Sequence, residues 1–116
     1  MIAKKYRFHG YGSLKFLYTK GRSVRGRYCS LKYIGNPRRD DSRLAVVVGR
    51  KVSKKAPVRN RIRRRVYEVM RTHWSMLKPA HDMIITVFDE RMATMPHDEL
   101  NKTIAEMLSK AELYKD

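Results

Sequence analysis

Residues 50–65 read RKVSKKAPVRNRIRRR and contain nine basic residues but no acidic residue. The basic residues are Arg50, Lys51, Lys54, Lys55, Arg59, Arg61, Arg63, Arg64 and Arg65. Pro57 predicts that a helix begins at this residue or just after it, because its ring fixes φ near the helical value and it lacks the N–H that a first turn leaves unpaired. Since no carboxylate in this stretch can neutralise the arginines, it predicts a cationic surface on a helix.

Apolar side chains recur at spacings of three and four after Pro57, which predicts one apolar stripe along this helix. The stripe consists of Val58, Ile62, Val66, Val69, Met70, His73 and Leu77. The side opposite the stripe carries Asn60, Arg64, Tyr67 and Arg71, flanked by Arg61 and Arg65 on one side and by Arg59 and Arg63 on the other. The helix is therefore expected to pack by one side and to present cations on the others.

Like charges stand four residues apart in this helix, at Arg59 and Arg63 and again at Arg61 and Arg65. Each such pair costs about a few tenths of a kcal/mol, whereas ordinary solvated helices mix acids with bases. A polyanion relieves the repulsion, and clustered Lys and Arg on one helix are typical of phosphate binding. A plain solvated surface is the alternative, but the pattern favours a nucleic-acid partner.

The chain has 116 residues and a formal net charge of +16, without an internal repeat or a linker that would divide it. It predicts a single nucleic-acid-binding domain over residues 1–116, with residues 1–12 as a flexible basic segment. No apolar run approaches the roughly 18 residues of a membrane span, and no signal-peptide pattern opens the chain. We therefore expect a cytoplasmic protein without a membrane partner.

Catalytic and metal-binding patterns are missing from the sequence. A single cysteine, Cys29, excludes an intrachain disulfide and a Cys-based zinc site, and the four histidines show no ligand spacing. His73 lies on the apolar stripe and is interpreted as a core imidazole. Adjacent acids such as Asp40 and Asp41 could attract Mg²⁺, but acids in turns are usually only solubilising. We expect a binding protein with no catalytic residue and no metal site of its own.

The N-terminal half predicts a short helix followed by strands. Ser13 could cap a helix that ends at Gly21 and that places Leu14, Leu17 and Tyr18 on one face. Residues 24–34 alternate as one strand, with Tyr28, Ser30 and Lys32 on one face and Cys29, Leu31 and Tyr33 on the other. Residues 35–42 are rich in turn formers and predict a solvated hairpin loop.

Two further strands and a last helix complete the predicted order. Residues 44–48 and 83–88 are short apolar runs typical of buried strands. A stripe of Leu100, Ile104, Met107, Leu108 and Ala111 predicts the final helix. The order α-β-β-α-β-α predicts an α+β single-domain sandwich with helices packed on a mixed sheet. Patterning alone favours a right-handed crossover between parallel strands.

The string Arg59-Asn60-Arg61-Ile62-Arg63-Arg64, with Lys51 and Ala56 before it, resembles the signature of the bacterial ribonuclease P protein subunit. Arg7-Phe8, Gly21, Val24 and Asp82-Met83-Ile84-Ile85 follow that family's order, so the resemblance covers essentially the whole chain. It implies a left-handed βαβ crossover through the basic helix. The chain departs from the family at Leu14 and Lys32, where aromatic residues are frequent.

The resemblance also implies a function. In this family a catalytic RNA cuts precursor tRNA at its mature 5′ end with Mg²⁺ that the RNA mainly holds, so the protein is an accessory subunit of a ribonucleoprotein endoribonuclease. Binding of the catalytic RNA is expected at Lys51, Lys55, Arg59, Asn60, Arg61, Arg63 and Arg64. Binding of the 5′ leader of precursor tRNA is expected at Tyr18, Tyr28, Ser30 and Lys32.

Four alternatives stand beside these expectations. The tyrosines could belong to the core, and Asn60 could make a local turn or cap contact. A ribosomal or generic structured-RNA-binding protein would share the charge and the fold class. A helix-turn-helix DNA binder would need a short helix just before the basic one, where residues 44–48 predict a strand, so no DNA partner is expected.

Overall fold

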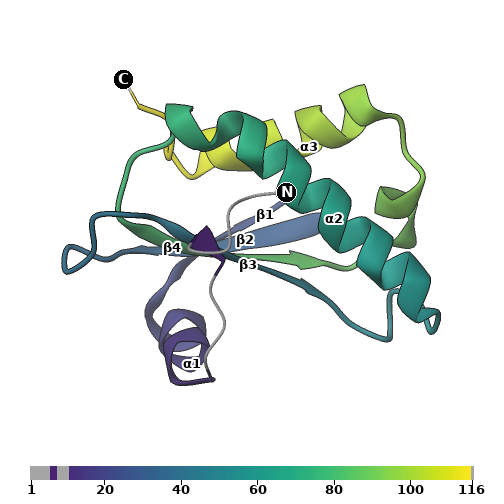
Figure 1. The fold of residues 1–116 in the computed structure, drawn as a ribbon, viewed down its shortest axis with the longest axis horizontal. Coiled ribbons are helices and arrows are strands. Elements are labelled where there is room, and N and C mark those ends of the chain that lie inside the picture. Colours follow the sequence, from purple (N-terminus) through teal and green to yellow (C-terminus); the bar gives the residue numbers. More distant parts are fainter. Residues whose placement is uncertain (1–5, 8–10, 116) are drawn as a thin grey trace.

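The computed structural model describes residues 6–7 and 11–115, and it contains one mixed sheet with the strand order β1-β2-β4-β3 (Figure 1). The strands are β1 (Arg22–Arg25), β2 (Cys29–Gly35), β3 (Arg43–Val48) and β4 (His81–Val87). The helices are α1 (Tyr11–Lys20), α2 (Ala56–His73) and α3 (His97–Lys110), with the 3-10 turns η2 (Trp74–Met76) and η3 (Glu90–Ala93). The predicted α+β class with helices on a mixed sheet is confirmed.

Helices cover both faces of the sheet. Figure 1 shows α2 and α3 over one face and α1 over the other. The predicted stripe of α2 is buried at Ile62, Val66, Val69, Met70 and His73, and the stripe of α3 is buried at Leu100, Ile104, Met107 and Leu108. On the opposite face, Leu17 of α1 packs with Ala45 and Ile84 in a smaller cluster. The domain therefore buries a large core under α2 and α3 and leaves α1 a smaller footprint.

The single strand predicted over residues 24–34 is wrong, because the chain reverses within it. β1 and β2 form an antiparallel hairpin whose turn contains Gly26, Arg27 and Tyr28. The N–H of Gly26 donates to the carbonyl of Cys29 at 2.8 Å. A Cβ at Gly26 would lie 3.1 Å from that carbonyl oxygen and 3.2 Å from Met107 Cγ, so a side chain fits poorly here. The apolar alternation continues in sequence through this turn, which hides the reversal.

Strand β4 lies between β2 and β3, so residues 35–42 do not form the predicted hairpin. β3 runs parallel to β4, with Val46 opposite Ile85, and α2 connects the two strands. This is the predicted βαβ connection. The left-handedness of its crossover remains a prediction. Because β3 directly precedes the basic loop, the helix-turn-helix alternative is wrong.

The predicted flexible segment over residues 1–12 is described only in part, since residues 1–5 and 8–10 lie outside the described residues. Arg7 forms an isolated parallel bridge with Leu44 of β3. Helix α1 begins at Tyr11, ahead of the predicted cap at Ser13, and its end at Gly21 is confirmed by a 2.8 Å hydrogen bond from the Gly21 N–H to the Leu17 carbonyl.

Candidate nucleic-acid interface

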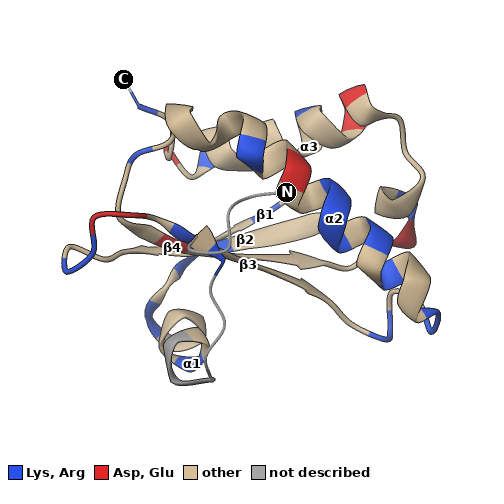
Figure 2. Cartoon of the chain, viewed as in Figure 1, with Lys and Arg blue, Asp and Glu red and all other residues tan. Residues whose placement is uncertain are grey.

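The loop over residues 49–55 and the outward side of α2 form one cationic surface, along which Figure 2 shows Lys and Arg. We call this surface the basic face and define it as Arg50, Lys51, Lys54, Lys55, Arg59, Asn60, Arg61, Arg63 and Arg64. Helix α2 begins at Ala56, one residue before the predicted start at Pro57, and its first turn has no acidic residue. Lys51 and Lys55 are exposed, as the sequence predicts.

Several arginines of α2 are restrained by backbone carbonyl groups. The Arg59 side chain donates to the Ser53 carbonyl at 2.8 Å, and Arg61 donates to the Ala93 carbonyl at 2.8 Å. Arg63 donates to the Val48 carbonyl at 3.5 Å. A carbonyl acceptor orients a guanidinium without neutralising its charge, unlike a carboxylate. The basic face therefore combines partly fixed geometry with undiminished positive charge.

Arg65 joins α2 to η3 rather than to solvent. It donates to the carbonyls of Met92 and Met95 at 2.9 and 2.6 Å. Burial lowers the pKa of Arg65, and the nearby charge of Arg61 adds to the decrease. Because the acceptors are backbone atoms from a distant segment, no pattern in the sequence could have revealed these contacts.

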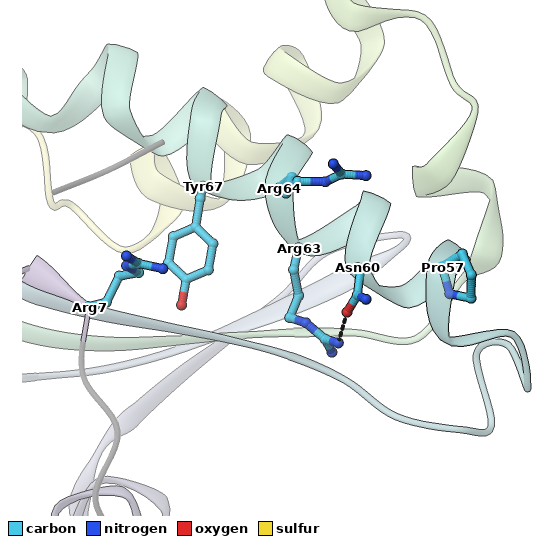
Figure 3. Close-up of a pocket in the computed structure, with 6 residues that line it drawn as sticks. All are labelled: Arg7, Pro57, Asn60, Arg63, Arg64 and Tyr67. Atoms are coloured by element: carbon cyan, nitrogen blue, oxygen red, sulfur yellow. Dashed lines mark hydrogen bonds between the residues drawn. The ribbon is translucent and has the colours of Figure 1, made fainter. Parts of the chain in front are cut away.

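An open hollow of about 670 Å³ lies beside α2 and is lined by Arg7, Pro57, Asn60, Arg63, Arg64 and Tyr67 (Figure 3). Arg63 donates to Asn60 Oδ1 at 2.6 Å, which is a local contact of the kind left open for Asn60. The Arg7 guanidinium lies 6.0 Å from the centroid of the Tyr67 ring. Its Nε is buried without a hydrogen-bond partner among the described residues. The lining residues include three guanidinium groups and no acid, an arrangement that suits phosphate groups.

The residues predicted for the RNA leader lie partly together on the α1 side of the sheet. Tyr18 is 44% exposed, and Lys32 Nζ lies 5.6 Å from the centroid of its ring and donates to its carbonyl oxygen. Ser30 is half-buried on the same strand face as Lys32, and Thr86 stands opposite it in β4. We call Tyr18, Lys32, Ser30 and Thr86 the polar strip. Thr86 was missed because its strand reads only as buried.

Tyr28 does not belong to this strip, so its predicted role at the leader is corrected. It is only 6% exposed and packs in the core on the α2 and α3 side of the sheet. Its hydroxyl donates to Glu99 Oε1 at 3.4 Å, and the guanidinium carbons of Arg27 and Arg91 lie 5.2 and 5.1 Å from its ring centroid. The hairpin turn places Tyr28 before β2, where the assumed strand alternation does not apply.

The buried groups His73 and Cys29 have partners inside the core. His73 lies between Asn101 Oδ1 at 2.7 Å and the Tyr114 hydroxyl at 3.0 Å, which confirms a core imidazole. Burial raises the pKa of the Cys29 thiol to about 12. Among residues 6–7 and 11–115, no group of three or more His, Cys, Asp or Glu could hold a metal ion. Within the same ranges, no helix has the length and apolar character to cross a membrane.

Comparisons with known proteins agree with this geometry. The family model described as Ribonuclease P matches residues 2–112. The chain is 35% identical over 98 residues to the ribonuclease P protein component of Pseudanabaena sp. (strain PCC 6903), covering 84% of this chain and 83% of that relative. It is 29% identical over 112 residues to the corresponding protein of Symbiobacterium thermophilum, covering 97% and 96% of the two chains.

Solved structures show the same fold. The RNase P protein of Staphylococcus aureus superposes with a TM-score of 0.84 at 25% identity, over 95% of this chain and 98% of that chain. The RNase P protein of Thermotoga maritima superposes with a TM-score of 0.79 at 22% identity, over 90% and 96% of the two chains. Because the family model covers nearly the whole chain and a relative above 30% identity is matched over most of its length, the chain belongs to the family of ribonuclease P protein components.

Proposed function

We propose that this chain binds the catalytic RNA of ribonuclease P and the 5′ leader of precursor tRNA, and thereby promotes Mg²⁺-dependent endonucleolytic removal of that leader. The observation that carries the proposal is the basic face, where Arg59, Arg61 and Arg63 of α2 are held by carbonyl oxygens and not by carboxylates. A surface built in this way keeps its charge for an external polyanion. A folded RNA supplies such a polyanion.

The catalytic RNA is assigned to the basic face. Lys51, Lys55, Arg59, Asn60, Arg61, Arg63 and Arg64 are the contacts we propose. Arg63 is oriented by both Val48 and Asn60, so less side-chain freedom is lost when it meets a phosphate. The lysines of the loop are exposed and can adapt to phosphates at several positions.

The 5′ leader is assigned to the polar strip. Tyr18 offers an exposed ring for an unpaired base, and Lys32 beside it offers a cation for the adjoining phosphate. The hydroxyl groups of Ser30 and Thr86 stand opposite each other on the sheet and can bond to bases or to a ribose 2′-OH. Such contacts favour a single strand over a duplex, because a duplex hides its base faces.

We assign the Mg²⁺ of the reaction mainly to the RNA. The acids of the described chain are scattered, and Asp82, Asp89 and Glu68 are each paired with an arginine. Bound Mg²⁺ lowers the pKa of a water nucleophile and stabilises charge on the phosphate in such reactions. The part of the protein is to stabilise, with its cations, the RNA folds that hold the metal.

The test is reconstitution with the cognate catalytic RNA and a precursor tRNA at low Mg²⁺. The protein should raise cleavage and bind precursor tRNA in the complex more tightly than mature tRNA, and protein without RNA should cleave nothing. Arg64→Ala should weaken assembly, whereas Lys110→Ala on α3 is a charge-matched control that should not. Equal affinity for precursor and mature tRNA would support a generic structured-RNA-binding protein instead.

A further inference from the structure

Phe88 and Arg25 form an exposed cation–π pair at the end of the sheet. Phe88 directly follows β4, is 38% exposed, and donates its N–H to the Tyr28 carbonyl at 3.1 Å. The guanidinium carbon of Arg25, an exposed residue of β1, lies 4.4 Å from the centroid of the Phe88 ring. The next residue, Asp89, is bound by Arg91 at 2.7 Å, so its charge is already compensated within the loop. Arg25 therefore retains a positive charge beside an aromatic ring.

This pair lies on the same face of the sheet as the polar strip. Ile84 packs beneath α1, and the two-residue period of a strand carries that face to Thr86 and on to Phe88. Arg25 stands opposite Ser30, which in turn stands opposite Thr86. The hydroxyls of the polar strip are thus flanked by Arg25 and Phe88 at one end and by Lys32 and Tyr18 at the other.

The spacing between these ends fits a short single strand. Lys32 stands opposite Ile84, four positions before Phe88 along β4. At about 3.3 Å per residue this separation is about 13 Å. A stacked nucleic-acid strand rises about 3.4 Å per nucleotide, so the interval spans about four stacked nucleotides or fewer extended ones. Two neighbouring unpaired bases would not reach both aromatic residues, whereas bases a few positions apart would.

We propose that Arg25 and Phe88 form a second base-stacking platform for the 5′ leader of precursor tRNA, separate from the one at Tyr18; this rests on the proposed function. An unpaired base stacks on the exposed side of the Arg25 guanidinium, whose carbon lies 4.4 Å from the centroid of the Phe88 ring. Any base presents a π face, so the platform tolerates all four. A purine has the larger face, and the platform therefore favours a purine over a pyrimidine at the leader position that reaches it.

The experiment uses the complex with the catalytic RNA and a series of precursor tRNAs in which one leader position at a time is abasic. With the unmodified protein, two positions a few nucleotides apart should each weaken binding by about 5-fold to 100-fold. Phe88→Leu, which keeps an apolar side chain but removes the ring, should abolish the loss at one of these positions and leave the other. Arg25→Gln should affect the same position, and Tyr18→Leu should affect the other.

Phe16→Leu is the matched control, because Phe16 is 57% exposed but lines a different hollow with Ile34 and Arg38. It should leave the abasic profile unchanged, and melting temperatures of all variants show whether the fold persists. An unchanged profile in Phe88→Leu, or an equal loss at every leader position and with mature tRNA, would overturn the platform. If the unmodified protein shows no sensitive position and binds both tRNAs equally, the leader assignment of the proposed function itself fails.

Discussion

In the function we propose, the basic face and the polar strip bind RNA by different physical means. The basic face concentrates charge, and its arginines reach phosphates through electrostatic attraction that extends over about a Debye length. The polar strip has one lysine, and its proposed contacts are stacking and hydrogen bonding at contact distance. Binding at the polar strip should therefore depend on accurate placement of its side chains, whereas the basic face should tolerate small displacements. If both proposals hold, this difference would let the protein hold a structured RNA tightly and still discriminate among unpaired strands.

A change in salt concentration should distinguish the basic face from the polar strip more strongly than any other test. If binding of the catalytic RNA neutralises about six to ten phosphates, its affinity should fall by roughly 10³ to 10⁵ between 50 and 200 mM salt. The ratio of precursor to mature tRNA affinities in the assembled complex should change far less, because stacking is only weakly screened. Binding titrations across this salt range measure both quantities. An affinity for catalytic RNA that does not change with salt would contradict the assignment of the catalytic RNA to the basic face.

Tyr28→Ala should have the next largest effect, and it tests whether Tyr28 belongs to the core or to the polar strip. The ring is buried, so its removal should cost about 3–5 kcal/mol of unfolding free energy and weaken all ligands together. Tyr18→Ala should leave stability nearly unchanged and weaken only precursor tRNA, by about 1–3 kcal/mol. Urea unfolding together with the two tRNA affinities checks both variants. A stable Tyr28→Ala protein with a selective leader defect would reverse our correction.

The contrast between Tyr18 and Tyr28 also shows what the sequence can reveal. The stripe of α2 and the charged residues opposite it follow from helical periodicity, and the structure confirms both. The faces of residues 24–34 depend on where the chain reverses, and the alternation does not mark the turn at Gly26. A single misplaced strand boundary moved Tyr28 from the core to the predicted surface.

Other features depend on partners that are distant in the sequence. The insertion of β4 between β2 and β3 could not be predicted from local pattern, because a turn-rich loop suits a hairpin and a longer crossover equally well. The carbonyls that hold Arg61 and Arg65 belong to η3 and to Met95 just after it, and the contact of Arg25 with Phe88 joins β1 to the end of β4. Residue types can suggest cations and aromatics, but only the tertiary fold decides which of them meet.

Arg65 and Arg64 are adjacent in α2, and their substitution should have smaller effects that distinguish a structural arginine from an RNA-binding one. Arg65→Ala should leave the Met92 and Met95 carbonyls without their donor and cost about 1–3 kcal/mol of stability. Arg64 is exposed and has no hydrogen bond to a described residue, so Arg64→Ala should change stability by less than about 0.5 kcal/mol. It should instead lower the affinity for catalytic RNA and reduce the steepness of log affinity against log salt concentration by about 0.7–0.9. Equal destabilisation of the two variants would contradict this division of roles.

Glu68 should give the smallest effect, because it is an exposed acid that already pairs with Arg71 on α2. Its Oε1 accepts from Arg71 Nε at 2.9 Å, and hydrogen bonding by Arg71 is the largest of the causes that lower the pKa of Glu68 to about 2. Since the folded pKa is depressed, the contribution of this pair is constant above the ordinary pKa of 4.5 and is lost only as the pH falls towards 2. Glu68→Gln removes the negative charge and leaves Arg71 available to a phosphate, so catalytic-RNA affinity should rise by less than about tenfold. Glu106→Gln on α3 makes the same charge change away from the basic face and should have no such effect. The ratio of variant to unmodified affinity should be equal at pH 6 and pH 8, and a ratio that changes between them would show that another titrating group controls this part of α2.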